Sequence, residues 1–162
     1  MRGGTLDAAS PAQFVEALGL HWESSGGTRM SGRVLGWLTI SHSAEQTAAE
    51  LAAVLSASKG SISTATRSLL QLGLIEKVSV PGERAVRFRI APGAWRHALY
   101  VSIELARGYR QLAELGLAAL PADSPAGRER LQEMHDVHAF LESEYPKLLE
   151  RYDAWRAAKE DA

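Results

Sequence analysis

Two helical patterns separated by only three residues, 56–58, constrain this fold more than any other feature. The pattern before them, "SAEQTAAELAAVL", repeats apolar residues at helical spacing, with Ser43 or Thr47 as its expected N-cap. The pattern after them runs over residues 59–72. Because two helices joined by so short a turn must cross at a steep angle, we expect a helix-turn-helix.

The second of these helices is expected to have a buried face and a polar face without carboxylates. Its apolar residues recur on one arc at helical spacing: Ile62, Ala65, Leu69 and Leu72. The opposite arc combines small, polar and cationic residues: Gly60, Ser63, Thr64, Arg67 and Gln71. Such a face suits an anionic partner, although a solvated helix surface would have a similar pattern.

Further helical patterns and two strand patterns flank the helix-turn-helix. Upstream, Ser10 and Gln13 form a capping box that begins a helix, and "SGRVLGWLTIS" indicates a short buried helix loosened by Gly32 and Gly36. Downstream, "LIEKVSV" and "VRFRI" alternate in the strand period around the turn "PGERA", which predicts a two-stranded hairpin. Helices followed by a hairpin in this order predict a winged helix-turn-helix.

The net charge of −1 conceals an uneven distribution. Residues 58–90 contain six cations and two carboxylates, whereas residues 121–162 contain six cations and ten carboxylates. The middle of the chain is therefore the part suited to an anion. The sequence has no cysteine, which excludes disulfides and cysteine-ligated zinc. It also has no apolar run long enough for a membrane span and no signal peptide, so we expect a cytoplasmic protein.

Residues 95–120 form a long helical pattern with two apolar stripes. One stripe passes through Val101 and Leu105, and the other passes through Ala106 and Tyr109. Because both sides are apolar, this helix is expected to have a neighbour on each side.

The last helical pattern carries the most regular spacing in the chain. From about residue 125 its apolar positions alternate at three and four residues, and the repeat keeps its phase across Pro146. This predicts one kinked helix that packs on a partner helix. With one winged helix per chain, a second copy is the simplest partner. The expected dimer-interface residues are Leu105, Leu112, Leu131, Met134, His138, Leu141, Tyr145, Leu148, Tyr152 and Trp155.

Three separated segments resemble the winged helix of MarR-like transcription regulators, especially their GbsR-type branch. These are "SGRVLGWLTIS", "TAAELAAVLSASKGSISTATRSLLQLGLIEKV" and "PGERAVRFRI", which follow one another in the expected order, and the resemblance covers about residues 32–90. The resemblance implies a homodimeric, operator-binding regulator whose terminal helices dimerise and whose DNA affinity is often set by a small ligand. It supplies no residues for that ligand.

Two enzymatic interpretations of "SASKGSIS" are weakened by its surroundings. A Walker A loop needs G-x-x-x-x-G-K-[ST], whereas here Lys59 precedes Gly60 and no strand comes before them. Ser56 and Lys59 match S-x-x-K, as in a small hydrolase, but no Ser-Asp-Asn or Lys-Thr-Gly follows. We therefore predict neither an enzyme nor a cofactor.

DNA binding explains the same stretch better. With Ser58 as N-cap, the free amides and positive end of the helix favour a phosphate, Lys59 adds a charge, and Gly60 keeps this end thin. The wing arginines suit phosphate or the minor groove. The predicted DNA-contacting residues are Ser58, Lys59, Gly60, Ser61, Ser63, Thr64, Arg67, Gln71, Arg84, Arg87 and Arg89.

Several residues leave alternatives open. Arg84 could instead pair with Glu83 or with a carboxylate of another helix, and Arg33 suits either a phosphate contact or an internal salt bridge. His135 and His138 lack further ligands for a metal, so no metal site is predicted, and His138 could fix the register of the seam. The tryptophans could line an effector pocket or belong to the core: Trp22, Trp37 and Trp95.

The predictions divide the chain into an N-terminal segment (1–9), a winged helix-turn-helix domain (10–92) and a helical dimerisation region (93–162). The expected fold is mainly α, with a three-helix core, a two-stranded β-hairpin wing and long C-terminal helices. We predict a homodimer that represses transcription from a pseudo-palindromic operator in double-stranded DNA, with a small-molecule effector as a further candidate partner. The alternative is a winged-helix module that docks an acidic protein through the same face.

Overall fold

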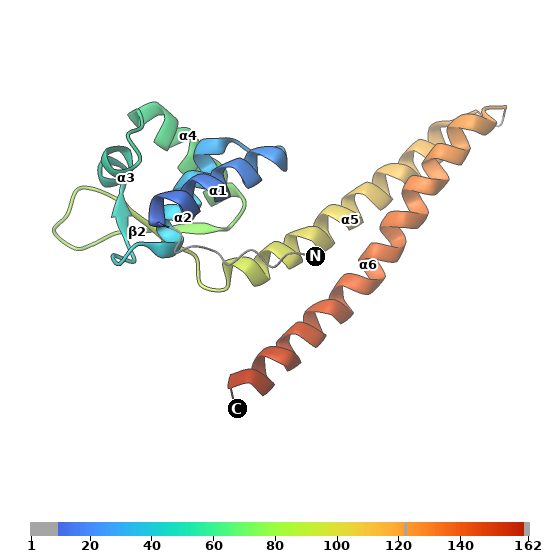
Figure 1. Cartoon of the computed structure of the whole chain (residues 1–162). Coiled ribbons are helices and arrows are strands. Elements are labelled where there is room, and N and C mark those ends of the chain that lie inside the picture. The colour runs from blue at the N-terminus through green and yellow to red at the C-terminus, as the bar shows by residue number, and fades with distance from the viewer. Residues whose placement is uncertain (1–9, 122, 161–162) are drawn as a thin grey trace, which may run out of the picture. The chain divides into compact units, whose positions relative to one another are not determined.

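The computed structural model describes residues 10–121 and 123–160, so the predicted N-terminal segment 1–9 lies outside the described residues. The chain divides into two compact units, Met1–Ala94 and Trp95–Ala162. The elements of the first unit are α1 (Pro11–Ser24), α2 (Arg29–Ile40), β1 (Gln46–Thr47), α3 (Ala48–Val54), α4 (Lys59–Gln71), β2 (Ile75–Val78) and β3 (Arg87–Ile90) (Figure 1). The second unit contains α5 (Ala94–Ala119) and α6 (Pro125–Glu160).

Side-chain caps set where the helices of the first unit begin. The predicted capping box of Ser10 and Gln13 is confirmed at α1. Thr47, rather than Ser43, caps α3, and Glu50 completes a second capping box there. The Oγ atom of Ser58 accepts a hydrogen bond from the backbone N–H of Ser61 at 3.1 Å and so caps α4. Each cap satisfies a backbone donor that a helix start otherwise leaves free.

The hairpin is part of a three-stranded sheet in which β3 is the central strand. β2 and β1 both pair with β3 in antiparallel register, and Phe88 lies opposite both Lys77 and Gln46. The sequence pattern predicted the two strands of the hairpin, β2 and β3, but missed the third strand of the sheet, β1. β1 has only two residues and follows the polar loop that contains Ser43, so its sequence carries no strand periodicity.

The core of the first unit joins its helices to the sheet. The largest fully buried apolar side chains are Leu35, Leu51, Ile62, Leu69 and Val34. Phe88 adds the inner face of β3 to this cluster. The α4 residues predicted to face inward are buried except Leu72, which caps the helix and is 39% exposed. This packing fixes which face of α4 remains outside.

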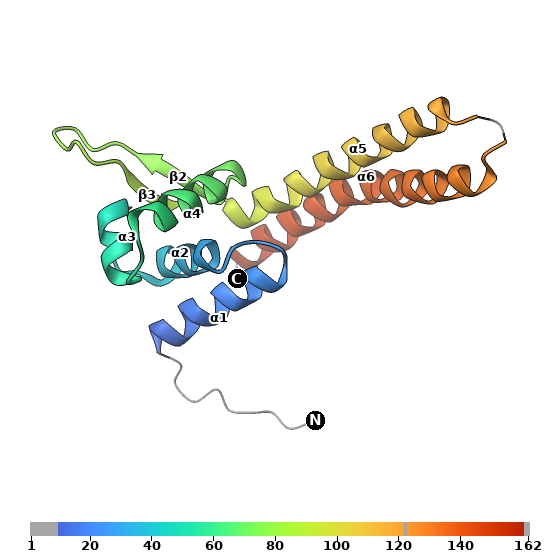
Figure 2. The same cartoon turned by 90° about the horizontal axis from the view of Figure 1, so that it is seen from above.

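Gly32 permits close contact between α1 and α2. A Cβ atom on Gly32 would lie 2.6 Å from both the carbonyl oxygen of Leu18 and the Cβ of Trp22. Gly32 therefore lets the two helices approach, a packing role that the sequence pattern did not predict. Figure 2 shows α1 and α2 side by side.

The second unit is an antiparallel helical hairpin held by apolar and ionic contacts. Gly116 of α5 lies against Leu131 of α6. Glu142 of α6 accepts hydrogen bonds from Arg107 at 2.9 Å and from Arg110 at 2.6 Å. As predicted, α6 continues as one helix through Pro146. Among residues 10–121 and 123–160, the helices lack the combination of length and apolarity that a membrane span requires.

Candidate nucleic-acid interface

The outer face of α4 is exposed and carries no acidic side chain. Ile62, Ala65 and Leu69 are buried on the inner side. The predicted contact residues of α4 and its cap are exposed, apart from the half-buried Ser61: Ser58, Lys59, Gly60, Ser63, Thr64, Arg67 and Gln71. The structure thus gathers these side chains on one surface.

The first turn of α4 offers backbone donors at this surface. Ser58 engages the N–H of Ser61, and the amides of the first turn are otherwise without helical partners. The positive end of the helix adds to the charge of Lys59. At Gly60, a Cβ atom would meet only the Oγ of Ser58, at 4.0 Å. Packing within the chain therefore does not require a glycine at this position.

The turn before α4 has an unusual backbone conformation. Ser56 has φ 49, a left-handed value that non-glycine residues adopt infrequently. The C-cap residue of α3, Leu55, precedes it, and its carbonyl accepts a hydrogen bond from Nη2 of Arg33 at 3.0 Å. Nε of Arg33 also lies 3.3 Å from Glu16. Arg33, for which the sequence left two alternatives, makes internal contacts and connects α2 to this turn.

The wing arginines differ in their partners. Arg84 is exposed, and the described residues include no ion-pair partner for it; its predicted alternative partner, Glu83, instead binds Arg87. Nε of Arg87 donates to Glu83 at 2.9 Å, and Nη1 of Arg87 lies 3.7 Å from Glu50. The hydrogen bond with Glu83 raises the pKa of Arg87.

Arg89 is also paired with carboxylates from two segments. Its Nε donates to Glu76 at 2.6 Å, and its Nη1 lies 3.5 Å from Glu45. Sequence reasoning missed Glu45 and Glu50 because neither belongs to the hairpin. The Thr47–Glu50 capping-box spacing was the available signal for Glu50.

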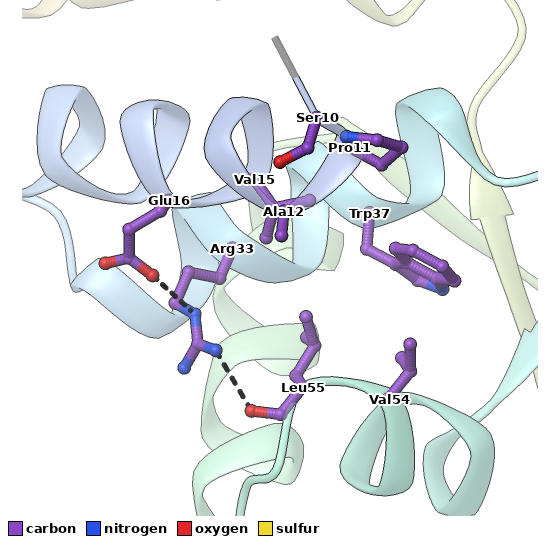
Figure 3. Close-up of a pocket in the computed structure, with 9 residues that line it drawn as sticks. All are labelled: Ser10, Pro11, Ala12, Val15, Glu16, Arg33, Trp37, Val54 and Leu55. Atoms are coloured by element: carbon purple, nitrogen blue, oxygen red, sulfur yellow. Dashed lines mark hydrogen bonds and ion pairs between the residues drawn. The ribbon is translucent and has the colours of Figure 1, made fainter.

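A cavity of about 420 Å³ lies within the first unit, between α1, α2 and the end of α3. Figure 3 shows Arg33 and Trp37 lining it from α2, with Val54 and Leu55 on the side of α3. Of the tryptophans considered for an effector pocket, only Trp37 is among its lining residues. Trp22 packs against the core, and Trp95 is 54% exposed.

The histidines of α6 have protein partners. Nδ1 of His135 lies 2.9 Å from Asp136, and Nε2 lies 3.6 Å from Glu114. Nδ1 of His138 lies 2.7 Å from the carbonyl oxygen of Met134, and its ring lies against Tyr109 of α5. Within residues 10–121 and 123–160, no cluster of histidine and carboxylate side chains is suited to hold a metal.

The predicted dimer residues fall into three groups in the single chain. Leu131 and His138 contact α5 of the same chain. Others are exposed: Leu105 (59%), Leu112 (57%), Leu148 (44%) and Trp155 (56%). The remaining members are half-buried: Met134, Leu141, Tyr145 and Tyr152. In the second stripe of α5, Ala106 is buried but Tyr109 is 42% exposed, whereas in the first stripe both Val101 and Leu105 are exposed.

Both units of the chain match models of MarR-family proteins. Residues 25–85 match a family model described as MarR family, and residues 93–156 match one described as MmpR5-like MarR family transcriptional regulator. The chain is 40% identical to the HTH-type transcriptional regulator MmpR5 of Mycobacterium tuberculosis over 86% of its own length and 85% of that protein.

Two crystal structures were also matched to this chain. A crystal structure described as a transcriptional regulator is 39% identical, with a TM-score of 0.82, over 89% of this chain and 98% of that chain. A mutant of MarR from E. coli, crystallised with operator DNA, is 25% identical, with a TM-score of 0.41, over 76% of this chain and 86% of that chain.

Proposed function

Because the chain belongs to the MarR family of transcriptional regulators, we propose that it binds operator DNA through α4 and the wing and represses transcription. The observation that carries this proposal is the exposed face of α4, which has Arg67 and Lys59 but no carboxylate. A major groove about 12 Å wide admits one helix, and base edges are read there by side chains that donate and accept hydrogen bonds.

The residues of α4 divide into two proposed roles. Ser58, Lys59 and the amides of the first turn hold a backbone phosphate, because the positive helix end and the free donors both favour an anion. Arg67 and Gln71 lie farther along the exposed face and reach base edges, for which guanine and adenine are the matching bidentate partners. Thr64 and Ser63 lie between these two groups.

In the wing, Arg84 is the proposed contact with phosphate or the minor groove. It is exposed, and the structure gives it no carboxylate partner among the described residues. Arg87 and Arg89, which the sequence also predicts to contact DNA, would have to do so while paired with Glu83 and Glu76. Neutralisation by these carboxylates reduces what either arginine contributes to phosphate binding.

The proposed active form is a homodimer. Leu105 and Leu112 of α5, and Leu148 and Trp155 of α6, are large apolar side chains exposed in the single chain. Contiguous exposed apolar rows on helices commonly mark association surfaces. A two-fold dimer places two α4 helices in successive major grooves about 34 Å apart, which requires a pseudo-palindromic site.

Selection of bound duplexes from a random pool tests the proposal. A palindromic consensus with half-sites about one helical turn apart is expected. Arg67→Ala should then relax the preference at one base position in each half-site, by about 1–3 kcal/mol in discrimination. A selected pool without any consensus would overturn sequence-specific binding.

The alternative function, docking of an acidic protein through α4, gives a different result in chromatography. An operator-binding protein should be retained on immobilised duplex DNA at moderate salt, whereas a protein-docking module should elute early. Early elution together with a featureless selection would favour the alternative.

A further inference from the structure

Arg33 of α2 connects α1 to the end of α3 through its guanidinium group. Its Nη2 donates a hydrogen bond to the carbonyl oxygen of Leu55, the C-cap of α3, at 3.0 Å. Its Nε lies 3.3 Å from Oε2 of Glu16 in α1. Figure 3 shows the guanidinium between these two partners. The side chain of Arg33 is only 26% exposed, so solvent screens these contacts in part.

Residues of α1 and α2 fix where this guanidinium lies. A Cβ atom on Gly19 of α1 would lie 2.8 Å from Cγ of Arg33, so the glycine makes room for the arginine stem. Glu16 also accepts a hydrogen bond from Nε of Arg29 at 2.6 Å. Arg29 and Arg33 are four residues apart on α2, so one carboxylate orients both guanidinium groups.

The carbonyl of Leu55 lies at the start of the turn between α3 and α4. The N–H groups of the next two residues, Ser56 and Ala57, donate back to carbonyls of α3 at 3.3 and 2.9 Å, as in a Schellman motif. Because the helix has ended, the carbonyl of Leu55 has no helical partner of its own. The hydrogen bond from Arg33 therefore completes the C-terminal cap of α3.

The local sequence does not favour the conformation of this turn. Ser56 has φ 49, in the left-handed region that glycine adopts readily and that other residues disfavour. Glycine is the usual residue at this position of a Schellman motif. Since serine lacks that preference, contacts from elsewhere in the fold must hold the turn. Two such contacts are the buried side chain of Leu55 and the hydrogen bond from Arg33.

We propose that Arg33 is a positioning residue for DNA binding, which holds the turn that sets the direction of α4. Ser58, the N-cap of α4, lies only three residues after Leu55. A change in the backbone of this turn therefore moves the first turn of α4 and the exposed face that follows it. Arg33 contributes no phosphate contact of its own. This role rests on the proposed function of α4 in reading DNA.

Loss of this contact should affect specific binding more than non-specific binding. A base contact requires a side chain within hydrogen-bond distance and in the correct orientation, whereas attraction to phosphates acts over about 8–10 Å. A displaced α4 therefore loses base contacts by Arg67 and Gln71 but keeps most of its attraction to the DNA backbone. The ratio of specific to non-specific affinity is the quantity that reports the position of α4.

Backbone amide resonances of the full chain, labelled with nitrogen-15, test the positioning role without DNA. Arg33→Gln removes the charged donor to Leu55 and should shift the amide resonances of residues 56–61. Arg29→Gln is the matched control, because it removes the same charge and the other partner of Glu16 from the same helix. It leaves the hydrogen bond to Leu55 in place, so these resonances should stay where they are. Equal shifts in both variants, or none in either, would overturn the proposal.

Affinities for a selected duplex and for a scrambled duplex of the same length test the consequence for DNA. Arg33→Gln should bind the selected duplex about tenfold more weakly, the loss expected for one charge-assisted hydrogen bond. The scrambled duplex, held by phosphate attraction, should lose no more than about twofold. The slope of log affinity against log salt should not change, and Arg29→Gln should keep the natural ratio of the two affinities. Fluorescence anisotropy over a salt series measures these quantities.

Two results would assign Arg33 a different role. A slope reduced by about one, with equal losses on both duplexes, would show that Arg33 contacts a phosphate itself and would overturn the positioning role. Unchanged affinities with a lowered melting temperature would show a contribution to stability alone and would overturn it as well. Thermal melting shows that each variant is folded at the temperature of the binding measurement.

A second variant keeps the test decisive if Arg33→Gln does not fold. Glu16→Gln retains Arg33 but removes the charge that orients it, so the ratio of specific to non-specific affinity should fall in the same direction by a smaller factor. An unchanged ratio in Glu16→Gln would then overturn the proposal. If the natural chain binds no duplex at all, the proposed function fails, while the amide resonances still decide whether Arg33 holds the turn.

Discussion

Arg87 donates a hydrogen bond through Nε to Glu83 at 2.9 Å, and its Nη1 lies 3.7 Å from Glu50 at the start of α3. Glu50 is also the capping-box carboxylate that accepts a hydrogen bond from the backbone N–H of Thr47. One arginine thus links the central strand of the sheet to the wing loop and to the first helix of the helix-turn-helix. Its role in DNA binding is expected to differ from that of Arg84, which has no carboxylate partner among the described residues.

Salt dependence distinguishes these two arginines. Arg84→Ala should weaken binding to every duplex and reduce the slope of log affinity against log salt by about one, because one phosphate contact is lost. Arg87→Ala should weaken binding with a smaller change in slope, because its charge is already neutralised by carboxylates. Equal losses of slope would show that Arg87 exchanges its carboxylates for a phosphate. Fluorescence anisotropy over a salt series measures both slopes.

Gly60→Ala should separate stability from DNA binding. Its Cβ would meet no close neighbour, so removing a flexible residue from a helix should stabilise the fold by up to about 1 kcal/mol. The same methyl group lies at the proposed phosphate contact and should weaken duplex binding. Urea unfolding and anisotropy measure the two effects.

Gly32→Ala is the matched control for Gly60→Ala. Its Cβ would lie 2.6 Å from the carbonyl oxygen of Leu18, so we expect a loss of stability of about 1–3 kcal/mol. If Gly60→Ala bound DNA as tightly as the natural chain, the first turn of α4 would not lie against a phosphate.

Stability of the helical hairpin should fall at acidic pH through Glu142. Hydrogen bonds from Arg110, and then from Arg107, lower the pKa of this carboxyl. A carboxyl with a lowered folded-state pKa stabilises above its ordinary value and loses that contribution as the pH falls through the lowered value. Glu142→Gln should therefore flatten the decline in melting temperature below the ordinary glutamate pKa. An unchanged pH profile would contradict these ion pairs.

The open stripe of α5 should govern self-association. Leu112→Glu places a charge on a side chain that is 57% exposed, so the single chain should fold normally while dimer formation is lost. Gln111→Glu adds the same charge at the neighbouring exposed position and should leave the dimer intact. Size-exclusion chromatography with light scattering measures both masses. A monomeric natural chain, or a dimeric Leu112→Glu, would argue against this interface.

The winged-helix segments predicted the family of this protein but did not establish its branch. The segments within residues 32–90 indicated a MarR-like winged helix, and the comparisons confirm the MarR family. The match over residues 93–156 describes an MmpR5-like regulator, whereas the GbsR-type branch stays a prediction. The helical pattern of this region did not distinguish branches, because apolar periodicity is shared by many long helices.

The sequence by itself determined the helices of the winged helix-turn-helix and the exposed face of α4. Caps and periodicity act over three or four residues, so they can be read in the local pattern at Ser58 and along α4. Tertiary structure alone decided which charges are paired and where the cavity lies. Arg89 meets a carboxylate 44 residues away in Glu45, and Arg33 reaches Leu55 across 22 residues. Such contacts depend on how separate elements pack, which no spacing along the chain encodes.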